Sequence, residues 1–261
     1  MRHKPGPAAK LSGSRAIRSE LRAMASPAKA RILSGFFKTG RGEYGEGDRF
    51  LGVVMPEVRK VVKAHWNIAA EEIVRLLRSK YHEERMAALL ILVEQYRRGD
   101  SSRRAAVYNL YLSHTAWINN WDLVDLTAHE IVGAHLAGTG GAILEKLARS
   151  KNLWERRIAM LSTYHCIRKG DSKAALKIAA LLLRDPHDLI HKAVGWMLRE
   201  VGKRCSMEHE CRFLDTHAAS MPRTMLRYAI ERFPDSLRMK YLRMGKRGVS
   251  TQKPETKQTL P

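Results

Sequence analysis

Apolar residues recur at helical spacing along most of this chain, and this pattern limits its fold more than any other feature. From Pro56 to Leu242 we find about eleven helical segments, joined by short breaks at RRGDSS, GTGG, RKGDSK and RDPHD. Two further helices are predicted over residues 14–25 and 27–37. No stretch shows the apolar and polar alternation of a half-buried strand. The sequence therefore predicts an all-α protein.

The helical segments also recur at a regular interval. Aligning HEERMAALLILVEQYRRGD (82–100) with LWERRIAMLSTYHCIRKGD (153–171) places Arg85 opposite Arg157, 72 residues apart, and half of that interval reaches Trp121. A further 35 residues lead from Arg157 to Lys192. Repeats of about 36 residues are typical of stacked helix pairs. We therefore expect a curved α-solenoid. Its concave wall should carry Trp121, Arg157 and Lys192. Asp125 lies one turn after Trp121 on this wall, and Trp196 lies one turn after Lys192.

The stretch NNWDLVD (119–125) combines aromatic and acidic residues that a core helix does not require. If a helix starts near Asn119, Trp121 and Asp125 lie four residues apart on one face. Asp122 is then expected to cap or face solvent at the first turn. Two other tryptophans, Trp117 and Trp154, are assigned to packing. The pattern predicts an aromatic plate beside a carboxylate.

The formal net charge of +21 is concentrated at the ends of the 261-residue chain. Residues 1–41 carry +9 and residues 238–261 carry +6, which leaves +6 for the middle. This excess favours a polyanionic partner such as nucleic acid, because neutralised phosphates release counterions. Anionic lipid is a rival partner, and basic residues that only keep the surface soluble are the simplest alternative. We expect basic flexible tails over 1–13 and 245–261 around a single repeat domain over 14–244.

Several functional classes are disfavoured by the sequence. Its apolar runs are far shorter than the roughly 20 residues of a membrane-spanning helix, and no secretory signal is visible, so we expect a cytoplasmic protein. The cysteines Cys166, Cys205 and Cys211 lack CxxC spacing, which indicates reduced thiols, and His209 among them does not complete a metal site. The glycine-rich loop at 40–47 lacks a GxxxxGK[ST] pattern, so a nucleotide-binding loop is not expected.

Aligned in this way, the chain resembles the DNA alkylation repair glycosylases of the AlkD type. The resemblance covers roughly residues 35–233 and is strongest in NNWDLVD (119–125), LWERR (153–157) and KAVGWMLRE (192–200). It implies HEAT-like repeats that grip double-stranded DNA and release N3- or N7-alkylated purines on an exposed wall. We expect no metal or redox cofactor, and a monomer.

The resemblance also implies roles for single residues. Asp125 would be the catalytic carboxylate, Trp121 and Trp196 would flank the lesion nucleotide, and Arg157 would bind the DNA backbone. Near the amino end, where family members place a tyrosine near DNA, this chain has Phe36 or Phe37. The further residues predicted to contact DNA are Lys192, Arg199, Arg85, Lys38, Arg223 and Arg227.

The chemistry of such a lesion explains why one carboxylate is enough. An N-alkylated purine already carries a positive charge, so its departure needs no general acid. Asp125 would stabilise the oxocarbenium sugar and orient water, while cation–π attraction from each indole would contribute about 0.5 to 2 kcal/mol. A non-catalytic HEAT-like module for damaged or branched DNA is the alternative, although a carboxylate facing phosphates would not help a pure binder. A protein-binding scaffold is a third possibility.

Overall fold

The computed structural model describes residues 13–138 and 141–244. Within these residues every regular element is a helix, and the one β-bridge, between Arg49 and Tyr81, is isolated. The prediction of an all-α fold is therefore confirmed. The predicted tails, apart from Gly13, lie outside the described residues. The chain divides into two compact units, Met1–His165 and Cys166–Pro261.

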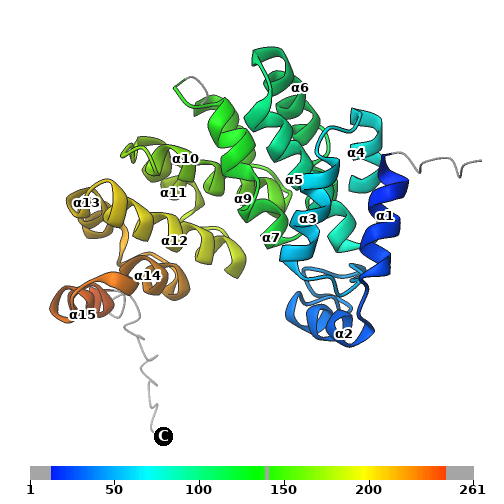
Figure 1. Cartoon of the computed structure of the whole chain (residues 1–261). Coiled ribbons are helices and arrows are strands. Elements are labelled where there is room, and N and C mark those ends of the chain that lie inside the picture. The colour runs from blue at the N-terminus through cyan, green and yellow to red at the C-terminus, as the bar shows by residue number, and fades with distance from the viewer. Residues whose placement is uncertain (1–12, 139–140, 245–261) are drawn as a thin grey trace, which may run out of the picture. The chain divides into compact units, whose positions relative to one another are not determined.

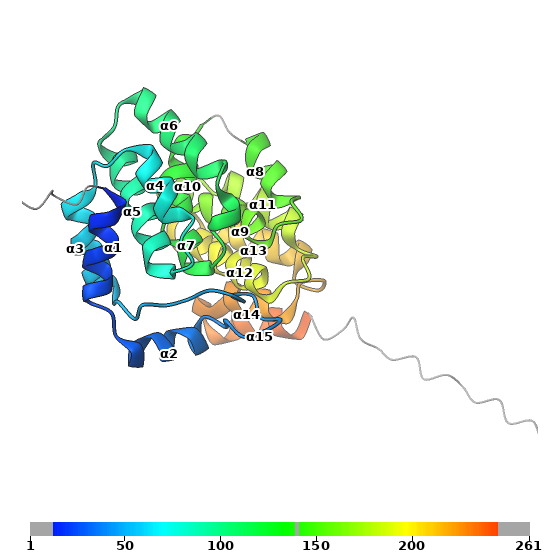
Figure 2. The same cartoon turned by 90° about the vertical axis from the view of Figure 1, so that its right-hand side faces the viewer.

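The first unit contains helices α1 to α9, with α10 crossing its end (Figures 1 and 2). Their bounds are α1 Ser14–Ala23, α2 Pro27–Phe36, α3 Met55–His65, α4 Ala70–Leu77, α5 His82–Arg98, α6 Ser101–Leu112, α7 Trp121–Asp125, α8 Gly141–Ala148, α9 Leu153–Ser162 and α10 Tyr164–Ile167. A π-helix, η2 (His129–Gly133), follows α7, and a short 3₁₀ turn, η1 (Thr115–Trp117), precedes it.

Helix α5 is the centre of the first unit. Its residues Met86–Val93 are apolar on every face and buried, as expected for a helix enclosed by neighbours. These neighbours include α3, α4 and α6 (Figure 1), and η2 also packs against α5. Successive helices packed side by side in this way form the arrangement of an α-solenoid.

The four polar residues that begin α5 are buried and bind different segments of the chain. Because a buried charge is stabilised only when it is paired or hydrogen-bonded, each of them fixes the position of its partners. Glu84 pairs with two arginines of α1, and Glu83 accepts backbone N–H groups from the loop before α3. The side chain of His82 binds Asp48 and Asp122, and that of Glu83 binds the backbone of Leu51, Gly52 and Val53. The side chain of Glu84 binds Arg18 and Arg22, and that of Arg85 binds Asp48 and the carbonyl of Ser79.

The structure corrects the repeat register by one residue. Arg85 donates through Nη1 to the carbonyl of Ser79 at 2.9 Å, and Arg156 donates through Nη1 to the carbonyl of Ser150 at 3.0 Å. Both serines also accept, through Oγ, the N–H of the residue two positions later, at 3.0 Å. Arg85 is thus equivalent to Arg156 rather than to Arg157.

Two short helices account for a difference in number. Between Met55 and Met244 the described residues form the thirteen α-helices α3 to α15, against about eleven predicted. Helix α7 has five residues and α10 has four, too few to show a helical period in the sequence. None of the described helices combines the length and apolar character that crossing a bilayer requires.

The second unit is organised around α12. Its other helices include α11, α13 and α14, which pack against α12. At Gly195 a Cβ atom would lie 2.4 Å from the carbonyl oxygen of Met225, so glycine is needed for α14 to approach α12 this closely. The bounds are α11 Lys173–Leu182, α12 Asp188–Arg204, α13 Met207–His217, α14 Arg223–Ala229 and α15 Asp235–Met244, with a 3₁₀ turn, η3, at Ile230–Arg232.

Candidate active site

Helix α7 places the predicted aromatic residue and the predicted carboxylate at its two ends. The side chain of Asn120 is the N-cap and accepts the N–H of Trp121 at 2.8 Å, so the helix starts where NNWD predicts. Asp125 is its last residue, one turn later. The π-helix η2 follows after three residues, and a Cβ on its Gly133 would lie 2.1 Å from the carbonyl oxygen of Ser162 in α9. This close approach holds α7 and η2 against α9.

Asp125 is held by both nitrogens of one guanidinium edge. Arg157 Nε donates to Asp125 Oδ1 at 2.8 Å and Arg157 Nη2 donates to Oδ2 at 2.7 Å. The side chains are 12% exposed for Asp125 and 6% for Arg157. Burial raises the pKa of Asp125 above its ordinary value, although Arg157 opposes the shift. The arrangement fixes a carboxylate that keeps a small exposed area.

Trp121 is fixed by stacking. Its ring lies parallel to Phe37 at 5.1 Å between centroids, and Phe37 in turn stacks on Phe50 at 5.0 Å. Phe36 contacts Trp121 edge-on at 5.9 Å and is itself 61% exposed. Such aromatic pairs contribute about 0.5–1.5 kcal/mol beyond area burial. Phe36 and Phe37, one of which was expected where family members place a tyrosine, therefore both border Trp121.

A buried histidine links α7 to the N-terminal loop. His82 Nε2 hydrogen-bonds Asp122 Oδ2 at 2.8 Å, and its Nδ1 hydrogen-bonds Asp48 Oδ2 at 2.9 Å. Burial alone would lower the pKa of His82, but the two carboxylates raise it to about 9. Burial of Asp48 acts to raise its pKa, yet His82 and Arg85 lower it below the ordinary value. Asp122 also accepts the N–H of Leu123 at 2.8 Å, so it combines the predicted capping role with a second, interior one.

The basic residues predicted to bind DNA in the first unit have different surroundings. Lys38 is exposed, in a turn with φ 54°. Arg85 is buried, with its side chain 4% exposed and Nη2 at 2.5 Å from Asp48 Oδ1, so this conformation does not present it to a phosphate. Arg157, predicted to bind the DNA backbone, instead makes a bidentate contact with Asp125. Both arginines are occupied by internal carboxylates that the sequence did not identify as their partners.

The remaining predicted contacts belong to the second unit. Trp196 is half-buried on α12, and Lys192 on the same helix pairs with Asp188 at 2.8 Å. Arg199 pairs with Glu231, Arg223 donates to the carbonyl of Leu242 at 3.2 Å, and Arg227 is exposed. The wall predicted to join Trp121 with Trp196 includes residues of both units and stays a prediction.

Two tryptophans were assigned to packing, and the structure separates them. Trp154 is buried and meets Tyr44 edge-on at 6.2 Å between ring centroids, whereas Trp117 is 39% exposed. In the described ranges, 13–138 and 141–244, no cluster of three His, Cys, Asp or Glu side chains is arranged to hold a metal ion. Sequence reasoning did not identify His82 and Phe37 as neighbours of α7. The signals available were four polar residues opening an otherwise apolar helix and the doublet of phenylalanines.

Comparison with known proteins gives a consistent picture. A family model described as DNA alkylation repair enzyme matches residues 17–233. One similar solved structure is described as a predicted DNA alkylation repair enzyme from Enterococcus faecalis, with a TM-score of 0.62. It is 16% identical, and the match covers 81% of this chain and 98% of that one, so it supports the fold. No curated protein matches this chain in sequence.

Proposed function

Because the chain belongs to the DNA alkylation repair enzyme family, we propose that it is a glycosylase that hydrolyses the N-glycosidic bond of N3- or N7-alkylated purines in duplex DNA. One observation carries the proposal. Asp125 lies on the same short helix as Trp121, and Arg157 of α9 fixes its carboxylate. A pre-oriented carboxylate is the group that this reaction needs, since electrostatic stabilisation is strongest where no reorganisation is required.

The proposed reaction balances without a proton donor. The bond between C1′ of deoxyribose and the purine nitrogen breaks, and its electron pair neutralises the cationic base. Asp125 stabilises the positive sugar that remains and orients a water molecule, whose oxygen bonds to C1′. The water loses one proton, so the products are a neutral alkylpurine, an abasic site and H⁺. Asp125 must be ionised in this scheme, and Arg157 favours that form.

Other residues would contact the nucleotide and the backbone. Trp121 would offer its ring to the cationic nucleotide by cation–π attraction. We also propose DNA contacts for Trp196 and for the basic residues Lys38, Lys192, Arg199, Arg223 and Arg227. The family resemblance in KAVGWMLRE (192–200) supports Trp196, Lys192 and Arg199. Arg157 is assigned a different role from the one predicted, as the group that positions Asp125.

The direct test is base release from alkylated duplex DNA. The wild type is expected to liberate N3-methyladenine or N7-methylguanine, and Asp125→Asn is expected to lower single-turnover release by about 10²-fold or more, by analogy with loss of one transition-state donor. DNA affinity should change little, because asparagine keeps the shape of the side chain. Asp100→Asn is the matched control, since asparagine is an equally good N-cap for α6.

A DNA-binding module without chemistry is the second candidate. The observation that favours it is that both carboxylate oxygens of Asp125 already accept from Arg157, as they would in a purely structural ion pair. Such a module would bind alkylated DNA but release no base above background from either lesion. That result, with intact binding, would reject the glycosylase.

A further inference from the structure

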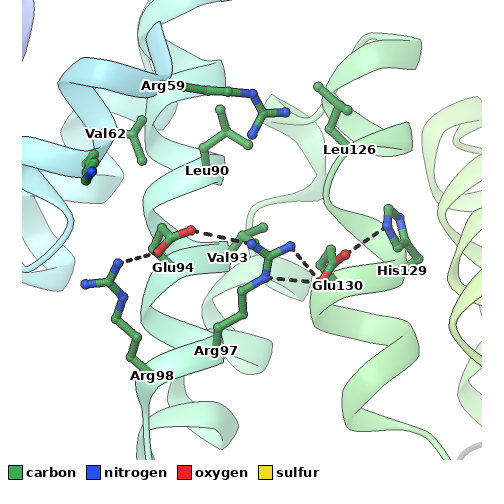
Figure 3. A pocket seen from close by; sticks show the side chains of 11 residues that line it. Arg59, Val62, Leu90, Val93, Glu94, Arg97, Arg98, Leu126, His129 and Glu130 are labelled. Atoms are coloured by element: carbon green, nitrogen blue, oxygen red, sulfur yellow. Dashed lines mark hydrogen bonds and ion pairs between the residues drawn. The ribbon is translucent and has the colours of Figure 1, made fainter. Parts of the chain in front are cut away.

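A cavity of about 440 Å³ lies in the first unit (Figure 3). Its lining comes from α3, α5 and the segment from Leu126 to Glu130 that follows α7. Leu126 is the residue after Asp125, and His129 lies one helical turn beyond Asp125. The segment that lines one side of the cavity therefore follows directly after the helix that ends in Asp125.

The floor of the cavity is apolar. Val62 of α3 and Leu90 and Val93 of α5 are buried side chains that face it, and Leu126 closes one side. Figure 3 shows Arg59 extending from α3 above Leu90 towards Leu126. An apolar floor below a cation suits a ligand that has both a carbon face and an anionic group.

The acidic residues of the cavity already have partners. Glu130 accepts from Arg97 Nη2 at 3.1 Å and from His129 Nε2 at 3.1 Å, and these contacts lower its pKa to about 2. Glu94 accepts from Arg98 Nη2 at 2.8 Å, with Arg97 Nη1 at 3.5 Å. Both carboxylates are thus neutralised by cations of the cavity wall.

Two of the four basic residues that line the cavity do not pair with its carboxylates. Arg59 and Lys63 are exposed, lie four residues apart on α3, and have no carboxylate partner among the described side chains. Four basic and two acidic residues give the lining an excess of two positive charges. An anion with two strongly accepting oxygens would accept hydrogen bonds from both of these cations.

We propose that this cavity binds a phosphodiester group of duplex DNA, next to the nucleotide held at Asp125. Arg59 and Lys63 donate to the phosphate oxygens, and the apolar floor receives the carbon face of the adjoining deoxyribose. The site adds a second point of attachment that fixes the position of the strand relative to Asp125. It rests on the DNA-binding part of the proposed function and is independent of base release.

The test is the salt dependence of DNA binding, measured by fluorescence anisotropy with an undamaged labelled duplex and the full chain. DNA affinity falls as salt rises, and each phosphate contact that is lost lowers the magnitude of the slope of log affinity against log salt by about 0.9. Because both cations bind one phosphate, Arg59→Ala with Lys63→Ala should lower the magnitude of this slope by about one and weaken binding at about 0.1 M salt by roughly tenfold. The substitution Arg59→Lys should retain most of the slope.

A matched control removes the same charge elsewhere. Lys146 on α8 and Lys151 after it are exposed, and Lys146→Ala with Lys151→Ala should leave the slope almost unchanged. Equal slopes for the wild type and the cavity variant would overturn the proposal, and so would equal losses in the cavity and control variants. Thermal melts establish that each variant is folded.

Two further measurements separate the sources of phosphate and the two proposals. Inorganic phosphate is titrated against chloride at equal ionic strength, and the Tm of the wild type and of the cavity variant is measured. If phosphate raises the Tm of the wild type alone, and the cavity variant keeps the wild-type salt dependence of DNA binding, the DNA assignment is overturned. Base release is scored separately. A reduced slope without any base release would retain the phosphate site and reject the glycosylase, whereas base release with an unchanged slope would do the reverse.

Discussion

At the scale of single residues, the fork of Arg157 controls the charge of Asp125. Burial favours the neutral acid, while two charge-assisted hydrogen bonds favour the carboxylate. Because only the ionised form can stabilise a positive sugar, base release should fall as pH falls through the pKa of Asp125. That pKa is above the ordinary value, so the loss should begin at a higher pH than for an exposed aspartate.

The substitution Arg157→Gln distinguishes positioning from phosphate binding. Without the guanidinium, burial raises the pKa of Asp125 further, so the acid limb of kcat/KM should move to higher pH. Breaking a buried pair should also cost about 3 kcal/mol of folding stability. A residue that only bound the DNA backbone would instead raise KM and leave the acid limb in place. Single-turnover release between pH 5 and 9 gives this comparison.

The residues of α7 show how far sequence reasoning reaches at this scale. The helix start and the spacing of Trp121 and Asp125 follow from local capping and a 3.6-residue period. The partner of Asp125 lies 32 residues away on another helix, and periodicity carries no information on where a guanidinium points. The ionic partners of Arg85 and Arg157 are tertiary facts for the same reason.

At the scale of elements, the start of α5 determines where α7 lies. His82 joins a carboxylate of α7 to Asp48 in the N-terminal loop, and its ring stacks on Phe50 at 4.6 Å between centroids. Phe37 of the same aromatic group supports Trp121. The protonated imidazole of His82 therefore helps to fix both the ring of Trp121 and the position of helix α7.

Stability should consequently depend on pH between 6.5 and 9. The folded-state pKa of His82, about 9, is above the unfolded value near 6.5, so its stabilisation is complete below pH 6.5 and lost as pH rises through 9. The integrated loss is on the order of 3 kcal/mol. Urea unfolding at several pH values should show this decline in the wild type. His82→Gln should be less stable at pH 7 and show a flatter profile; parallel profiles would contradict the assignment.

The least predictable elements are those whose length and type depend on close contact with a neighbouring helix. Helix α7 has five residues, and its continuation as a π-helix accompanies the contact of Gly133 with α9. Long helices such as α5 were evident from their apolar runs, because burial on all faces requires them. A short helix ended by tertiary packing leaves no period of its own in the sequence.

At the scale of the whole molecule, the net charge and the candidate active site are separate features. The site on α7 contains ion pairs that are internally matched, whereas the excess charge lies largely near the ends of the sequence. The all-α architecture followed from periodicity, and the family from three short motifs. Charge composition predicted a polyanion but did not locate where it binds, since charge count is independent of position along the fold.

Removing residues 1–12 and 245–261 separates non-specific affinity from chemistry. The truncated chain loses six of its 21 net positive charges. Its affinity for undamaged duplex should fall and depend less steeply on salt, because fewer counterions are released on binding. Single-turnover base release at saturating alkylated DNA should stay within about twofold of the full chain, since Asp125, Arg157 and Trp121 are untouched. A rate loss comparable to that of Asp125→Asn would show instead that the terminal segments take part in the chemical step.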